Sequence, residues 1–327
     1  MAREIAAPTR VLPRYEERQV RIISLKSIIF ARFIRNRAAV FGFLVVALLV
    51  LYAFAGPLLT PYTPDQVNLR ERFAPPSVIM LTTGKIYNLD AIQQVSAENQ
   101  FRFGHPLGTD DLGRDTMTRS MFGGRVSLGI GFIVAITSTV MSAFLGALSG
   151  YLGGWWDNII QRANDVSHAL PDLPILMILS KIFPPGFWTM CLILLMLGGI
   201  RGGRITRAMV LRLKKEQFTE AAISSGAQWH RLIFRHFIPN SLSPLFVSVT
   251  LGAGGAIRTE TSLSYLGLGI QPPMPSWGNM LSNAQQYFFS APWLVFYPGI
   301  FIFLTLMCFN MVGDGLRDAF DPRMTKR

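Results

Sequence analysis

Cysteine and charge are both scarce in this chain of 327 residues. Its two cysteines, Cys191 and Cys308, lie far apart in apolar runs. This spacing excludes a disulfide framework and a thiolate zinc site, so we expect both to pack as small buried hydrophobic groups. Charged residues make up 15% of the chain, whereas soluble domains average about 25%. Because 50% of the residues are hydrophobic, this deficit indicates a chain that lies in a lipid bilayer.

The motifs of nucleotide and metal chemistry are also missing. Gly84-Lys85 looks like the end of a phosphate loop, but Ile79 and Ile86 stand where the loop needs a glycine and a hydroxyl. No histidine has a carboxylate or thiol partner at metal-ligand spacing. The four histidines are His105, His168, His230 and His236. We therefore predict no catalytic residue, no cofactor and no metal site.

What charge there is gathers in two basic segments. Residues 1–37 hold nine Lys/Arg against three acids, and residues 201–236 hold eight against two. These two segments account for the whole net charge of +12, while residues 57–124 are nearly balanced. No aromatic residues interleave with the basic ones in the manner of a nucleic-acid site. The alternation of basic and neutral segments across apolar runs instead fits the positive-inside rule, so we predict no nucleic-acid partner.

Six apolar segments approach the length of about 20 residues that a membrane-spanning helix needs. The expected spans are 39–59, 126–150, 166–183, 187–200, 241–259 and 293–312. Pro171 and Pro174 shorten and bend the third of them. The sequence therefore predicts an all-α membrane protein with six transmembrane helices.

The two basic segments give this arrangement an orientation. Six spans place both on the cytoplasmic side, whereas five or seven would put one on the wrong side. Both termini are then cytoplasmic. The expected divisions are a cytoplasmic N-terminus 1–38, a first span 39–59, an outer loop 60–125, a core 126–313 with five spans, and a tail 314–327.

Residues 19–35 predict a separate amphipathic helix on the inner membrane surface. Its apolar residues recur at helical spacing and basic residues stand between them. The apolar set is Ile22, Ile23, Leu25, Ile28, Ile29 and Phe33, and the basic set is Arg21, Lys26, Arg32 and Arg35. A basic tail without this structure is the alternative.

Small residues recur every four positions at the end of the second expected span. Gly146, Gly150 and Gly154 form this series. Such spacing lets helices approach closely in lipid, so it predicts tight packing rather than a functional site.

Two acids near the ends of the expected spans are candidates for lining a solute pathway. Asp172 is four residues after His168, and a structural pairing is the default interpretation, with a proton relay as the alternative. Glu260 follows the fifth expected span. Acids at such depth usually face a cavity or another helix.

A polar segment, 205–239, separates the fourth and fifth expected spans. Its residues Glu220-Ala221-Ala222, followed by Gly226 and Pro239, resemble the EAA loop of the permeases of ABC importers. Ile238 stands where that family has a leucine. The resemblance implies that Glu220, Ala221, Ala222 and Gly226 form a short helix pair that contacts an ATPase subunit.

Further motifs over about 100–325 resemble the dipeptide and oligopeptide permeases, in particular the second of their two permease subunits. They include His105-Pro106-Leu107-Gly108-Thr109-Asp110, Ser264-Tyr265-Leu266-Gly267-Leu268-Gly269 and Asp314-Gly315-Leu316-Arg317-Asp318. Nickel permeases share many of these signatures. Residues 60–104 depart from the shorter family members as an insertion in the outer loop.

The resemblance implies an ABC importer type I permease-like fold and a non-catalytic subunit in the cell inner membrane. It also implies four kinds of partner. They are a second homologous permease subunit, two ATPase subunits, an extracytoplasmic solute-binding protein and the lipid bilayer. A secondary transporter, or a membrane-anchored scaffold without transport, is the alternative of a different class. ATP-dependent transport and co-purification of an ATPase distinguish the three.

Overall fold

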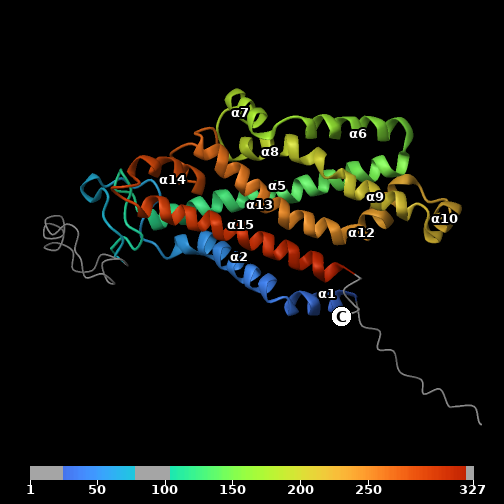
Figure 1. Cartoon of the computed structure of the whole chain (residues 1–327), viewed down its shortest axis with the longest axis horizontal. Helices are drawn as coiled ribbons and strands as arrows, with labels where there is room; N and C mark the ends of the chain where they lie inside the picture. Colours follow the sequence, from blue (N-terminus) through green and yellow to red (C-terminus); the bar gives the residue numbers. More distant parts are fainter. Residues whose placement is uncertain (1–24, 78–103, 322–327) are drawn as a thin grey trace, which may run out of the picture.

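The computed structural model describes residues 25–77 and 104–321, and these are almost entirely helical (Figure 1). No strand occurs in this described part; one isolated β-bridge joins Thr109 to Asp115. Irregular segments and α14 (Trp277–Ala284) lie at one end of the molecule, and α10 (Gln217–Ser224) lies at the other. We call these the loop end and the hairpin end. The prediction of an all-α protein is confirmed for the described residues.

Three helices are long and apolar enough to cross a membrane. They are α2 (Arg37–Ala55) with the turn η1 (Gly56–Leu58), α5 (Thr116–Leu152) and α15 (Trp293–Phe320). They coincide with the first, second and sixth expected spans.

A fourth candidate span consists of α8 (Phe187–Arg201) and α9 (Gly203–Leu213), which meet at an angle of 44°. The described residues thus hold three candidate spans, or up to four when this bent pair counts as one. The sequence predicted six. The third and fifth expected spans do not meet the criterion of length and composition, although α13 (Leu242–Tyr265) forms one continuous helix over the fifth. The six-span count therefore stays a prediction.

The third expected span is divided between two helices. The chain leaves α6 (Gly154–Ala169) at Leu170, whose ψ of 135° is extended, and resumes as α7 (Asp172–Ile182) after Pro171. A residue before proline avoids the helical region, which explains the break. The 11 residues of α7 extend about 16 Å, roughly half of a bilayer core. A proline bend within one span was expected, and the structure has a complete interruption.

Helix α5 begins ten residues before the expected second span. The Asp115 carboxylate caps it by accepting from the backbone N–H of Thr118 at 2.7 Å. Arg119 and Arg125 donate to the carbonyls of Pro64 and Ala53 at 2.9 and 2.8 Å. The chain itself thus supplies the partners that water would otherwise provide.

Helix α5 runs through the centre of the molecule, between α2, α8, α9 and α13. The largest fully buried side chain is Trp277, at the start of α14. Its indole N–H donates to the carbonyl of Ser120 at 2.9 Å, and its ring stacks on Phe301 at 5.7 Å. The side chain of Trp277 therefore anchors the loop end on α5 and α15.

The glycine series on α5 packs as its spacing predicted, with one exception. A Cβ at Gly146 would collide with the backbone of Gly203, and one at Gly150 would meet Arg207 and Val210 at 3.0 Å. These two glycines allow α9 to lie directly against α5. Gly154 has open space around it and a φ of 53°, so it serves the turn into α6 instead.

At the N-terminus, α1 (Leu25–Arg35) covers the second part of the expected amphipathic helix, and residues 19–24 lie outside the described range. It packs against α15, and Arg32 donates to the carbonyl of Asp321 at 3.0 Å. The remaining elements are η2 (Leu69–Glu71), α11 (Trp229–Leu232), the π-helical turn η3 (Ile233–Phe237), α12 (Ile238–Asn240) and η4 (Gln285–Tyr287). The placement of α1 on a membrane surface stays a prediction.

Candidate functional site

The four residues singled out from the EAA resemblance lie together at the hairpin end, on α10 and in the turn that follows it (Figure 1). Glu220 and Ala221 are exposed, whereas Ala222 is half-buried. Gly226 has a φ of 81°, a conformation that favours glycine. The N–H of Gly226 donates to the carbonyl of Ile223 at 2.9 Å, and that of Ala227 donates to Ala222 at 3.0 Å. These bonds close α10 with a glycine cap and reverse the chain toward α11.

A small apolar core holds this hairpin on the membrane helices. Ala147 of α5, Val210 of α9 and Phe237 of η3 are fully buried in it, and Ala222 packs against them. The hydroxyl of the buried Thr219 donates to the carbonyl of Leu213 at 2.7 Å. The same core contains residues of α5 and α9, so it joins the hairpin to both helices.

Three large apolar side chains of α10 and α11 are partly exposed at the hairpin end. Phe218, Ile223 and Trp229 are 41%, 47% and 47% exposed, and we call these three the hairpin patch. The patch stands on an otherwise polar and basic segment, next to Glu220. Exposed apolar side chains at one end of a molecule are groups that a protein partner can cover. The geometry therefore favours a protein partner at the hairpin end.

Three ion pairs connect α6 and α7 to α8 and α9. Arg207 donates to both carboxylate oxygens of Asp157 at 2.6 Å, and this hydrogen bonding lowers the pKa of Asp157. The other pairs join Arg204 to Asp165 at 2.6 Å and Arg201 to Asp172. Sequence reasoning counted these arginines only as cytoplasmic charge. Their three-residue spacing, which puts them on one helix face, was the signal that it missed.

The two candidate pathway residues differ in their surroundings. Glu260 is fully buried, and its carboxylate accepts from Ser127 at 3.1 Å and from Ser264 at 2.7 Å. The bond from Ser127 joins α5 to α13 in the interior, and the bond from Ser264 lies within α13. Asp172 is 55% exposed and pairs with Arg201 rather than with His168. Of the two, only Asp172 lies at the surface of the chain.

A cluster at the loop end was not predicted as a site. His105 places Nδ1 2.8 Å from Asp115 and Nε2 3.1 Å from Glu71. Burial lowers the pKa of His105, but the hydrogen bonds to Asp115 and Glu71 outweigh it and raise the pKa above its ordinary value. With carboxylate acceptors at both nitrogens, the charged imidazolium satisfies both contacts. The sequence motif that begins at His105 gave no indication of this pairing.

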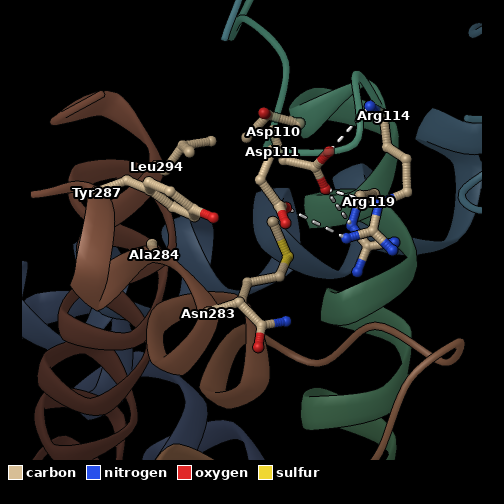
Figure 2. Close-up of a pocket in the computed structure, with 10 residues that line it drawn as sticks. Asp110, Asp111, Arg114, Arg119, Asn283, Ala284, Tyr287 and Leu294 are labelled. Carbon is tan, nitrogen blue, oxygen red and sulfur yellow. Dashed lines mark hydrogen bonds and ion pairs between the residues drawn. The ribbon is translucent and has the colours of Figure 1, made fainter. Parts of the chain in front are cut away.

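Beside this cluster lies a small polar pocket, between the start of α5 and the helices α14 and α15. Figure 2 shows the carboxylates of Asp110 and Asp111 directed toward the guanidinium groups of Arg114 and Arg119. The Nε atom of Arg114 lies 2.7 Å from Oδ2 of Asp110. The pocket charges thus largely neutralise one another. Within residues 25–77 and 104–321, no group of three His, Cys, Asp or Glu side chains is placed to hold a metal ion.

Comparison with known proteins extends the motifs to most of the chain. Residues 142–326 match the family described as binding-protein-dependent transport system inner membrane component. Residues 24–76 match the N-terminal TM domain of oligopeptide transport permease C.

Full-length relatives agree with these family matches. The chain is 37% identical to a dipeptide transport system permease protein DppC of Alkalihalophilus pseudofirmus, over 90% of this chain and 89% of the relative. It is 36% identical to the oligopeptide transport system permease protein OppC of Bacillus subtilis, over 90% and 88%. It is 34% identical to that of Haemophilus influenzae, over 96% and 94%.

Proposed function

Because the chain belongs to the family of binding-protein-dependent transport system inner membrane components, a family of transport subunits rather than enzymes, we propose that it is a permease subunit of an ATP-driven importer of dipeptides or oligopeptides. The names of its relatives support the peptide class. Other small solutes, nickel among them, are the alternative substrate class. In this assembly the chain supplies one half of the pathway, and a second homologous permease subunit supplies the other.

The hairpin patch is the observation that carries the coupling role. Two ATPase subunits bind the complex from the cytoplasm, and one of them receives α10 with Glu220, Ala221, Ala222 and the Gly226 turn. When the ATPases close, the hairpin moves and its apolar core carries α5 and α9 with it. The spans then rotate as rigid bodies and change the side to which the pathway opens.

The charge distribution supports the orientation of the subunit in the cell inner membrane. The basic hairpin end and both termini face the cytoplasm, and six spans cross the bilayer. The loop end faces outward, where a soluble solute-binding protein delivers the peptide. The segments 56–77 and 104–115 form an ordered surface there, held by the His105 pairs.

Co-purification from native membranes tests the coupling role. Ala221 is exposed on α10, so Ala221→Arg places bulk at the proposed contact without entering the core of this chain. Thr63→Arg makes a comparable exposed change at the loop end. We expect the ATPase to co-purify with the wild type and with Thr63→Arg, and to be lost with Ala221→Arg. Retention of the ATPase by Ala221→Arg contradicts the placement of the contact on α10.

A further inference from the structure

The three ion pairs between α6–α7 and α8–α9 are not equivalent. Asp157 and Arg207 are 17% and 32% exposed, form two hydrogen bonds, and have Ser149 as an additional donor to Asp157. Asp165 and Arg204 are 56% and 51% exposed. Asp172 is 55% exposed, while its partner Arg201 is largely buried. The first pair is therefore the least exposed contact, whereas Asp165, Arg204 and Asp172 present charge to the outside of the chain.

Further exposed polar side chains lie near these open pairs in the sequence. His168 is exposed between Asp165 and Asp172, and Arg162 is exposed one helical turn before Asp165. We call the residues Arg162, Asp165, His168, Asp172, Arg201 and Arg204 the charged strip. An apolar groove that includes Trp155, Ile159, Val166 and Met196 runs beside it.

The position of the strip restricts what can cover it. The helices α6 and α7 lie along α8, which is half of a candidate span. Ionised side chains at membrane depth are strongly disfavoured in contact with lipid and usually face a water-filled cavity or another protein segment. Because acids and bases alternate, the strip is complementary to a molecule that carries both charges.

We propose that the charged strip lines the solute pathway and binds the two charged ends of a zwitterionic peptide by exchange of ion pairs. This proposal rests on the proposed function. The peptide carboxylate forms an ion pair with the guanidinium of Arg204 or Arg201, since a planar carboxylate matches the geometry of a guanidinium. The peptide ammonium takes the carboxylate that is released, Asp165 or Asp172.

The exposure of Asp165, Arg204 and Asp172 makes this exchange feasible. An ion pair open to water contributes little to stability, so its opening costs little and the peptide contacts replace it. For the same reason the peptide is held weakly and leaves easily, as conduction through a pathway requires. The less exposed pair Asp157–Arg207 keeps α6 on α9 while the other two exchange.

Cysteine accessibility in membrane vesicles that contain the assembled complex tests the proposal. His168→Cys places a thiol in the strip and leaves all three ion pairs unchanged. Cys191 and Cys308 are buried, so the background reaction is low. Leu48→Cys is the control, because Leu48 is 65% exposed on the apolar α2. The probe is a negatively charged, membrane-impermeant methanethiosulfonate.

We expect the thiol of the His168→Cys variant to react with the probe and that of Leu48→Cys to remain unmodified. A dipeptide with free termini slows the reaction of His168→Cys at least threefold. The same dipeptide with an acetylated amino end and an amidated carboxyl end gives no protection. Failure of the thiol to react with and without ATP, or equal protection by the blocked dipeptide, overturns the proposal. Because this measurement needs no ATP hydrolysis, it is independent of the test of ATPase coupling.

A second pair of variants separates the pathway role from a structural one. Replacement of both Asp165 and Asp172 by Asn slows uptake of the free dipeptide about tenfold, as the loss of a charge-assisted hydrogen bond implies. The melting temperature of the complex stays at the wild-type value. Asp157→Asn lowers the melting temperature instead. If the Asp165/Asp172 double variant loses stability to the same extent as Asp157→Asn, the strip is structural and the proposal is wrong.

Discussion

At the scale of single residues, Gly226 joins the sequence motif to a measurable backbone conformation. Its φ of 81° is unfavourable for other residues by about 1–2 kcal/mol, and asparagine tolerates it best. Among the described residues, no atom beyond the glycine and its chain neighbours lies within 4 Å of an added Cβ. The Cβ of a substituted residue therefore displaces no described neighbour.

Two replacements of Gly226 separate strain from contact. Gly226→Asn keeps the turn, and we expect it to retain most of the uptake. Gly226→Trp inserts into the membrane normally but abolishes uptake, because its ring occupies the proposed ATPase contact. Uptake into membrane vesicles, with the amount of chain measured by immunoblot, checks both. Normal uptake by Gly226→Trp contradicts the assignment of the coupling turn.

His105 predicts a pH dependence at the loop end. Because its folded pKa is raised, its pairs with Asp115 and Glu71 stabilise the loop fully below the unfolded pKa of about 6.5. This stabilisation is lost as the pH rises through the folded pKa. We expect hydrogen exchange in 104–115 to become faster across that window. Glu71→Gln removes one of the two charges and shifts the transition to lower pH; an unchanged transition would show that Glu71 does not control it.

At the scale of elements, the contact between α5 and α9 depends on two glycines facing each other. Gly146→Ala places a methyl group against the Gly203 backbone, which has no side chain that can move away. We expect a loss on the order of 1–3 kcal/mol, seen as a lower melting temperature in detergent. Gly255→Ala on α13 is the control, because nothing lies within 4 Å of its added Cβ. Equal melting temperatures for the two variants would contradict the close approach.

The same elements show what sequence reasoning achieves and where it stops. Apolar length predicted α2 and α15 closely, and spacing predicted the contacts of Gly146 and Gly150. Helix α5 begins ten residues before the expected second span, and in that stretch carbonyls of Pro64 and Ala53 accept from Arg119 and Arg125. Hydropathy reports the average environment of a segment and contains no information about such distant partners.

At the candidate site, too, the sequence predicted some features and the tertiary structure was needed for others. The EAA motif located the hairpin, and its glycine predicted the turn. The charged strip was not foreseen because its pairs join residues that lie 29 and 39 positions apart. Asp172 was singled out for its depth, but its partner Arg201 was counted as part of a cytoplasmic loop. A local pattern identifies a charged residue, and only the tertiary structure identifies its counterion.

At the scale of the whole molecule, the hairpin end, the packed centre of α5 and the loop end form one connected unit. Apolar contacts join α10 to α5 and α9, and the bond from Ser127 to Glu260 joins α5 to α13 toward the loop end. These contacts connect the hairpin end to the loop end through packed helices. The proposed ATP-driven pathway requires such a connection.

Peptide uptake into proteoliposomes with defined energy sources tests the central claim most directly. The complex of this chain with its permease and ATPase partners is reconstituted, and the solute-binding protein is added outside with a labelled dipeptide. We predict uptake that requires ATP inside the vesicles and continues after ionophores have collapsed all ion gradients. Uptake that proceeds without ATP and stops when the gradients are collapsed would contradict the account and identify a secondary transporter.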